Sequence, residues 1–353
     1  MVSPTAVTAL SAILAAWLLL SPARADDLAP SGIPLGDRFE RIDDDLDGQL
    51  GVYVKRLSDG AEARHRVDRP WYLASTVKVP LAVVALRQVE TGTLALDQRL
   101  TLTAADYVDG GGALLYAEPG TVFSLRNLLE RMIRDSDNTA TDMVIRLVGE
   151  ENANARMRAL IPDRPLNPVT TLLQVRQDAY GTIHDDVANL TNWDFIEIRA
   201  AGEEPRRYQV LMDKLAISAD QAQQPSVRDA FERYYEEGLN SGRLDTLGAW
   251  LHQLAEGNLL NREHTALLLG FMSDLNTGKN RIQAGLPKGT PFAHKTGTQI
   301  ARACDAGLIY PTDPERTVVV VTCAEGFNGL DDAEAAFRRV GESLAGVSIG
   351  PDK

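Results

Sequence analysis

Strand-like segments lie at the two ends of this chain, and a long stretch of helical sequence separates them. Near the N-terminus, residues 49–56 and 61–67 read as strands, and Ser58-Asp59-Gly60 between them favours a hairpin turn. Near the C-terminus, three more strands are expected over 291–298, 304–310 and 317–323. One antiparallel sheet is therefore built from both chain ends, with flanking helices and an inserted all-helical lobe, which is an α+β fold.

The helices are predicted from apolar spacing. Residues 75–91 are rich in Ala, Leu and Val and predict a buried helix, in which Pro80 is near enough to the start to be tolerated. Residues 124–134 carry an apolar stripe at helical spacing, with Ser124 as the N-cap. Further helices are expected over 38–47, 139–148, 247–255, 262–276 and 331–345. Residues 150–245 mix charged helical pieces with proline-rich turns and give no clear pattern.

The N-terminal segment indicates export. Ala9 to Leu20 is an apolar run that is short for a bilayer span, and Ala23-Arg24-Ala25 matches a small-x-small cleavage signal. We predict a cleaved signal peptide over 1–25, and hence a periplasmic or secreted protein with no membrane span after cleavage. The n-region has no Lys or Arg, so an uncleaved N-terminal anchor is the alternative.

The domain plan follows from these segments. A linker is expected over 26–36 and a single catalytic domain over 37–350. Its sheet lobe comprises about 37–72 and 245–350, and its helical lobe about 73–244.

Charge and cysteine content limit the partners. The net charge of −13 repels phosphate backbones and argues against nucleic-acid binding. Two cysteines and five histidines show no zinc-ligand spacing, so we expect neither a metal nor an organic cofactor. If residues 311–316 form a turn, Cys304 lies opposite Cys323 on adjacent strands. A cross-strand disulfide and two neighbouring thiols are both compatible with that register.

Three short motifs carry the chemistry. They are Ser75-Thr76-Val77-Lys78 at the start of the buried helix, Ser136-Asp137-Asn138 between two helices, and Lys295-Thr296-Gly297-Thr298 on a late strand. Each motif alone is more often structural than functional. Together, in this order and local context, they indicate one active site.

The residue types suit nucleophilic catalysis. Ser75 and Lys78 are three apart and share a helix face. A serine hydroxyl needs a nearby base, and Lys78 serves only if burial or a second cation such as Lys295 keeps it partly neutral. Gly297 lets the strand approach a ligand, so that the N–H groups of Ser75 and Thr298 face a developing oxyanion. Each such donor contributes about 3–4 kcal/mol in the transition state.

These motifs resemble those of the class A serine β-lactamases and the related penicillin-binding peptidases. The run Lys279-Asn280-Arg281-Ile282 before the third motif is similar as well. The resemblance covers about 36–149 and 245–345. It implies that Ser75 is acylated, that Lys78 accepts its proton and that Ser136 relays a proton to the leaving nitrogen. It also implies that Asn138 binds the substrate's side-chain amide, and that its carboxylate is bound by Lys295, Thr296 and Thr298.

One element of the class A pattern is missing. The Ω-loop Glu that activates the deacylating water has no counterpart, since the nearest string, Asp163-Arg164-Pro165-Leu166-Asn167, lacks a Glu. The interval from Ser136 to Lys295 exceeds the family's usual interval by about fifty residues, which points to an atypical insert over about 165–245. Four acidic residues in the insert are conceivable substitutes: Asp178, Asp185, Asp186 and Glu197.

The leading hypothesis is therefore an exported, monomeric serine hydrolase that opens β-lactams through a Ser75 acyl-enzyme. One alternative is a peptidase or esterase of the same fold that acts on a cell-wall-like peptide. Another is a covalent β-lactam binder that deacylates poorly. Asp43 to Gly48 resembles the start of an EF-hand loop, but Val54 stands at position 12, so calcium binding is not expected.

Two further residues, His294 and Arg302, lie beside the third motif. His294 should point away from Lys295 and be structural. Arg302 either helps to hold a substrate carboxylate or is a solvated arginine.

Overall fold

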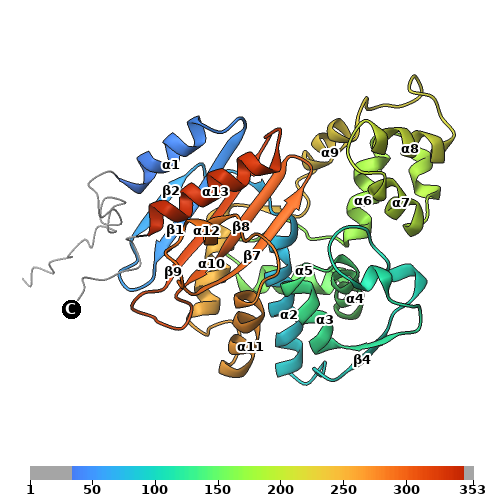
Figure 1. Cartoon of the computed structure of the whole chain (residues 1–353). Coiled ribbons are helices and arrows are strands. Elements are labelled where there is room, and N and C mark those ends of the chain that lie inside the picture. Colours follow the sequence, from blue (N-terminus) through green and yellow to red (C-terminus); the bar gives the residue numbers. More distant parts are fainter. Residues whose placement is uncertain (1–33, 346–353) are drawn as a thin grey trace, which may run out of the picture.

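A five-stranded antiparallel sheet forms the centre of the computed structural model, which describes residues 34–345 (Figure 1). The strand order is β2-β1-β9-β8-β7. The strands are β1 Gln49–Arg56, β2 Glu62–His65, β7 Phe292–Gln299, β8 Arg302–Ile309 and β9 Val318–Glu325. Because β1 pairs with β9 along its whole length, the sheet is built from both ends of the chain, which confirms the predicted fold class.

The alternation of apolar side chains along the strands determines what covers each face of the sheet. On β9, Val318 and Val320 belong to the core under α1 Leu35–Asp44 and α13 Leu330–Leu344. Val319 and Val321 belong to the opposite core, which includes α10 Leu244–Ala255. Successive side chains of a strand point to opposite faces of the sheet, so a nearly continuous apolar run is expected for a strand that is buried on both faces.

The helical lobe packs beside the sheet at the β7 edge (Figure 1). Its helices are η2 Ala74–Val77, α2 Lys78–Glu90, α3 Leu125–Arg134, α4 Asn138–Val148, α5 Glu150–Leu160 and α11 Arg262–Ser273. Short elements complete it: β3 Trp71–Tyr72, β4 Arg99–Thr101, η3 Ala104–Asp106, η4 Leu114–Tyr116, β5 Val122–Ser124 and β6 Ser241–Gly242. The short helix α12 Ile282–Gly285 packs instead against α13, and Ile282 belongs to the core on that face of the sheet. Ser124 caps α3 as predicted, because its Oγ accepts the N–H of Asn127 at 3.2 Å.

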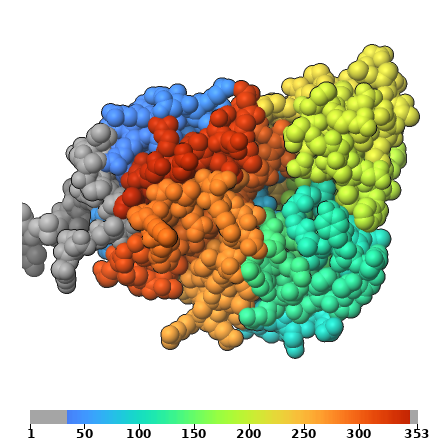
Figure 2. Space-filling view, viewed as in Figure 1, coloured from blue at the N-terminus to red at the C-terminus, as the bar shows by residue number. Residues whose placement is uncertain are grey.

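The segment that the sequence left unparsed is a helical insert with its own small core (Figure 2, upper right). It contains α6 Leu172–Gly181, η5 Asp185–Asn189, α7 Asn192–Ala200, α8 Arg206–Leu215 and α9 Val227–Tyr235. The apolar positions that hold it together are divided among these short elements, so that none of them shows a long amphipathic stripe.

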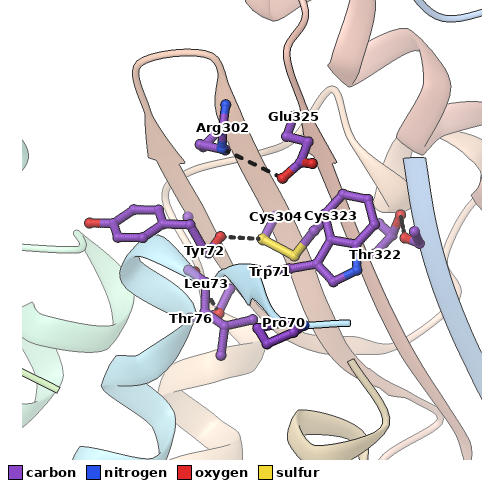
Figure 3. Close-up of a disulfide and its surroundings, with 12 residues drawn as sticks. Pro70, Trp71, Tyr72, Leu73, Thr76, Arg302, Cys304, Thr322, Cys323 and Glu325 are labelled. Atoms are coloured by element: carbon purple, nitrogen blue, oxygen red, sulfur yellow. Dashed lines mark hydrogen bonds and ion pairs between the residues drawn. A yellow bond between two sulfur atoms is a disulfide. The ribbon is translucent and has the colours of Figure 1, made fainter. Parts of the chain in front are cut away.

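The register of the last two strands confirms the sequence prediction. Cys304 lies opposite Cys323, and the two form a disulfide with a Cα–Cα distance of 4.1 Å. Figure 3 shows the disulfide beside Trp71 and Tyr72, so that it underlies the segment leading into η2. The alternative of two free thiols is excluded.

The N-terminal predictions fall mostly outside the described residues. The predicted signal peptide and most of the linker precede residue 34, and α1 begins at Leu35, inside the segment expected to be linker. Within residues 34–345, no helix combines the length and the apolar character needed to cross a bilayer.

Candidate active site

The three motifs meet at the hydroxyl of Ser136. Nζ of Lys78 donates to Ser136 O at 2.7 Å and lies 3.2 Å from Ser136 Oγ. Nζ of Lys295 donates to the same Oγ at 2.9 Å. Lys78 also donates to Oδ1 of Asn138 at 2.8 Å. Three segments distant in the sequence therefore contribute to one hydrogen-bonded cluster, as the order of the motifs and their resemblance to the family implied.

Ser75 lies in a 3₁₀ turn rather than within the long helix. The turn η2 runs into α2 at Lys78, and Ala74 just before Ser75 has a left-handed φ of 46°. The first N–H groups of a helical turn have no acceptor inside it, so the Ser75 N–H is available to a ligand. Among the described residues, Lys78 has no hydrogen bond to Ser75 Oγ; its amine is bound to Ser136 and Asn138 instead.

Strand β7 packs directly against this turn because residue 297 is glycine. A Cβ at Gly297 would lie 2.8 Å from Leu73 O and 2.9 Å from the N atom of Ser75. Any side chain would separate the strand from the nucleophile. The close approach supports the expectation that the strand end at Thr298 and the N–H of Ser75 face the same ligand atom.

The Ser136 turn is held in a left-handed backbone conformation with φ 55°. Asp137 then caps α4, accepting the N–H of Ala140 at 2.9 Å, and its other oxygen accepts the N–H of Leu114 at 2.9 Å. These bonds fix the turn on both sides. A non-glycine residue in this conformation is strained, and such strain is common at functional sites.

Burial changes the charge of both lysines. Burial lowers the pKa of Lys78 from 10.5 to about 7, helped by the charge of Arg176 and opposed by Asp137 and Asp142. Burial, and then the charge of Lys78, lowers the pKa of Lys295 well below its ordinary value. Repulsion between the two lysines is mutual, so a charge on either one favours the neutral form of the other, and Arg176 is a further cation that acts on Lys78.

The far end of the third motif is organised by Arg281. This buried arginine donates to Gly297 O at 2.9 Å and to Thr298 Oγ1 at 2.6 Å. Thr296 is bonded to Thr277 through their hydroxyls at 2.6 Å. Arg281, Thr296 and Thr298 also line the large cavity described below, so this end of the cavity presents hydroxyl and cationic groups suited to a carboxylate.

The two flanking residues are structural. His294 is buried, and its Nδ1 lies 2.7 Å from Oδ1 of Asp305, as expected for a side chain on the other face from Lys295. Arg302 does not line the active-site cavity, where it could bind the carboxylate of a substrate, and it is not solvated. It is buried, donates to Glu232 at 2.9 and 2.6 Å, and stacks over Tyr235.

A cavity of about 1300 Å³ opens beside Ser75, Ser136 and Asn138. The four acidic residues considered as substitutes for the missing Glu do not line it. Asp178 accepts a hydrogen bond from Gln174, and Glu197 pairs with Lys214. The string Asp163 to Asn167 is also absent from the lining, so its partial match to the Ω-loop pattern is not a catalytic feature of this cavity.

Sequence reasoning missed two cavity residues, Asp109 and Arg176. They form a buried ion pair of 2.6 Å, and the carbonyl of Asp109 accepts Nδ2 of Asn138 at 2.7 Å. The only local signal was the run Gly110-Gly111-Gly112 after Asp109, where a Cβ at Gly110 would lie 2.5 Å from Nδ2 of Asn138. Nothing in the sequence pairs Asp109 with an arginine 67 positions later.

Ser75 lies in a 3₁₀ turn, and the edge strand β7 packs against this turn at Gly297. The buried amines of Lys78 and Lys295 both bind the hydroxyl of Ser136. This arrangement defines a serine hydrolase of the β-lactamase and transpeptidase type. The chain belongs to the beta-lactamase enzyme family, whose model matches residues 34–193 and 206–346. This confirms the predicted family, and the protein is an enzyme of that class.

Individual relatives agree with this assignment. A β-lactamase of Mycobacterium tuberculosis is 26% identical over 327 residues, which are 92% of this chain and 89% of that one. A β-lactamase of Sphaerobacter thermophilus has a similar structure, with a TM-score of 0.64, 24% identity, and 88% and 96% of the two chains covered. A variant of PBP-A, solved as an acyl-enzyme complex with penicillin G, has a TM-score of 0.66 at 20% identity, covering 92% and 97%.

Proposed function

We propose that this protein hydrolyses β-lactam amides through an acyl-enzyme on Ser75. The observation that carries the proposal is the convergence of the amines of Lys78 and Lys295 on the hydroxyl of Ser136, in the wall of the cavity that contains Ser75. The family's activity gives the reaction, and this geometry gives each residue a role.

In acylation, Oγ of Ser75 attacks the lactam carbonyl and its proton passes to the neutral amine of Lys78. A pKa of about 7 leaves a large share of Lys78 unprotonated at neutral pH, so it can act as the base. The N–H groups of Ser75 and Thr298 stabilise the oxyanion. The Lys78 ammonium then returns this proton through the hydroxyl of Ser136, which is bonded to both amines, to the departing nitrogen as the C–N bond breaks, so that Lys78 is neutral and Ser136 protonated again.

Substrate binding uses the two ends of the cavity. The lactam's carboxylate binds to Thr296, Thr298 and Lys295, and its negative charge raises the pKa of Lys295 and restores the ammonium form. At the other end, Asn138 binds the amide of the acyl side chain.

For deacylation, Asp109 is the carboxylate that we propose to hold the hydrolytic water. Five carboxylates line the cavity: Asp109, Glu118, Asp135, Glu203 and Glu204. Among these, Asp109 alone is buried, and its Oδ2 has no hydrogen-bond partner in the described residues. Asp109→Asn should slow deacylation by about 10²–10⁴-fold and let the acyl-enzyme accumulate. Glu118→Gln, at an exposed position of the same cavity, is the matched control and should not.

A second candidate function is covalent β-lactam binding with little turnover. The absence of an Ω-loop Glu favours it, and so does the similar fold of PBP-A, a variant of which was solved as a penicillin acyl-enzyme. A peptidase or esterase of the same fold is the remaining alternative.

Hydrolysis of a chromogenic cephalosporin, followed together with intact-protein mass, separates these functions. Continuous turnover that Ser75→Ala abolishes, and that Ser58→Ala at an exposed turn leaves intact, supports hydrolysis. A single stoichiometric burst, with the added mass on Ser75, supports covalent binding. An absence of both turnover and added mass contradicts the proposal and favours a peptidase or esterase.

We also propose that the protein is exported to the periplasm or secreted, and that it acts as a monomer. The segment over 1–25 supports export. Determination of the mature N-terminus tests it, since cleavage after Ala25 is expected, and sedimentation tests the monomer.

A further inference from the structure

Three arginines of the helical insert face the active-site cavity. Arg176 on α6, Arg199 on α7 and Arg207 on α8 all line it, together with Ser75 and Asn138. They come from three α-helices of the helical insert, within the stretch of about 165–245 that the sequence motifs did not explain. We call Arg176, Arg199 and Arg207 the arginine cluster.

Two members of the arginine cluster are buried with hydrogen-bonding capacity unused. Arg207 is 5% exposed and Arg176 is 6% exposed. Among the described residues, Nε of Arg207 and Nη1 of Arg176 have no hydrogen-bond partner. An unpaired buried donor on a charged group is costly, so a native protein retains it where a ligand supplies the missing acceptor.

Arg207 has no counter-ion within the described part of the chain. No carboxylate of residues 34–345 forms an ion pair with it, and Glu203, the acid that acts on it, is exposed. Burial, with the charges of Arg199 and Arg176, lowers the pKa of Arg207. Its place as the second residue of α8 adds the unfavourable positive end of that helix.

The charges of the arginine cluster all act on the hydroxyl of Tyr180. Burial raises the pKa of Tyr180 to about 12, and the groups that act on its hydroxyl include Arg176, Asp109, Arg207 and Arg199. Asp109 neutralises one guanidinium of the cluster through its 2.6 Å bond to Arg176. Of the groups that act on the Tyr180 hydroxyl, three are cationic and one is anionic, and Glu203 and Glu204 are exposed acids in the same cavity wall.

The insert is fixed to the loop over residues 105–112, which contains Asp109, so the arginine cluster has a defined position relative to Asn138. Nδ2 of Asn192 on α7 donates to Ala105 O at 2.8 Å and to Tyr107 O at 3.0 Å. Asp109 then connects the two sides, because its carbonyl accepts Asn138 Nδ2 and its carboxylate accepts Arg176 Nε. Figure 2 shows the insert next to the teal segment that carries this loop.

We propose that the arginine cluster is a subsite for a carboxylate at the far end of the substrate's acyl side chain. The orientation of the substrate in this proposal rests on the proposed function. There Asn138 binds the amide of the acyl side chain, and the atoms of that side chain beyond the amide extend toward Arg176. The substrate class is therefore a lactam with two carboxylates. One is on the ring and binds at Thr296 and Thr298, and the second is on the acyl group and binds at Arg176 and Arg207.

A matched pair of penicillins tests this subsite. Adipoyl- and hexanoyl-6-aminopenicillanate have side chains of equal length that end in a carboxylate and a methyl group. We expect the adipoyl compound to acylate Ser75 about ten- to a hundredfold faster, the effect of one to two charge-assisted hydrogen bonds. Arg207→Met should bring this ratio close to one, whereas Arg206→Met, at the exposed neighbour on the same helix, should leave it unchanged.

Thermal unfolding distinguishes a binding role of Arg207 from a structural one. If Arg207 is kept for a ligand, Arg207→Met removes an uncompensated buried charge and the melting temperature of the free protein rises. A fall in melting temperature, with the adipoyl preference retained, would overturn the proposal.

Calorimetric titration with adipate makes the test independent of acylation. Adipate binding that Arg207→Met weakens and Arg206→Met does not supports the subsite, even if neither penicillin reacts and the proposed function fails. Equal acylation by both penicillins, with adipate binding that is absent or insensitive to Arg207→Met, refutes the subsite and leaves the proposed function intact.

Discussion

The acylation rate should depend on pH through the protonation of Lys78. The base must be neutral, and burial lowers the pKa of Lys78 from 10.5 to about 7. About half of the enzyme is then competent at pH 7, whereas a lysine of ordinary pKa would be neutral in about one molecule in 3000. Burial of this amine therefore raises the neutral fraction of Lys78 at pH 7 about 10³-fold, which is equivalent to about 4 kcal/mol.

The direction of the pH dependence of acylation follows from the protonation of Lys78. As the pH rises through 7 Lys78 loses its proton, so the rate rises and then levels off. Between pH 7 and pH 5 it should fall about fiftyfold, and between pH 7 and pH 9 it should only about double. The assay is the second-order rate of Ser75 acylation by hexanoyl-6-aminopenicillanate, measured by quenched-flow and intact-protein mass from pH 5 to 9.

Arg176→Gln should shift the midpoint of the pH–rate profile, whereas a purely structural role of Lys78 predicts no such shift. The charge of Arg176 lowers the pKa of Lys78, so its removal should move the midpoint to higher pH. Arg206→Gln, which is exposed, should leave the midpoint in place. A rate that is flat from pH 5 to 8, or that rises only above pH 9, would refute the assignment of Lys78 as the base.

Three further perturbations test the fold around the site. Gly297→Ala should reduce acylation by at least about 10²-fold, since the new Cβ would lie 2.9 Å from Ser75 N; Gly270→Ala, where nothing lies within 4 Å, is the control and should keep full activity. Replacing both Cys304 and Cys323 by Ala should lower the free energy of unfolding by about 3 kcal/mol, because the disulfide closes a loop of 19 residues, and should make the melting temperature insensitive to dithiothreitol. Asp245 is buried but accepts hydrogen bonds from Arg243 and Arg64, which hold its pKa at about 2, so wild-type stability should fall as the pH drops from about 4 toward 2. Asp245→Asn should be less stable at pH 7 in denaturant titration and should lack that acid-dependent loss; equal stability of the two proteins at pH 7 would contradict the role of this ion-pair cluster.

The deacylation step decides between the two candidate functions. An enzyme that turns over needs a carboxylate beside the acyl carbonyl, and Asp109 is the buried one that the cavity offers. If Asp109→Asn leaves turnover unchanged while Ser75→Ala abolishes it, the hydrolytic water is activated elsewhere.

Several features that depend on local pattern or register could be predicted from the sequence alone. The residues of β1, the cap at Ser124 and the pairing of Cys304 with Cys323 were predicted correctly. These follow from side-chain alternation, capping chemistry and the fixed register of a hairpin. The meeting of Lys78, Ser136 and Lys295 was also anticipated, because three short motifs in one order carry that information through resemblance.

Only the tertiary structure determined which charged groups are buried next to one another. Arg176 and Asp109 form an ion pair across 67 positions, and no local pattern encodes that pairing. Lys295 is completely buried, and this burial together with the charge of Lys78 lowers the pKa of Lys295 well below its ordinary value. Electrostatic energies depend on distance and solvent exposure in three dimensions, and neither quantity can be read along the chain.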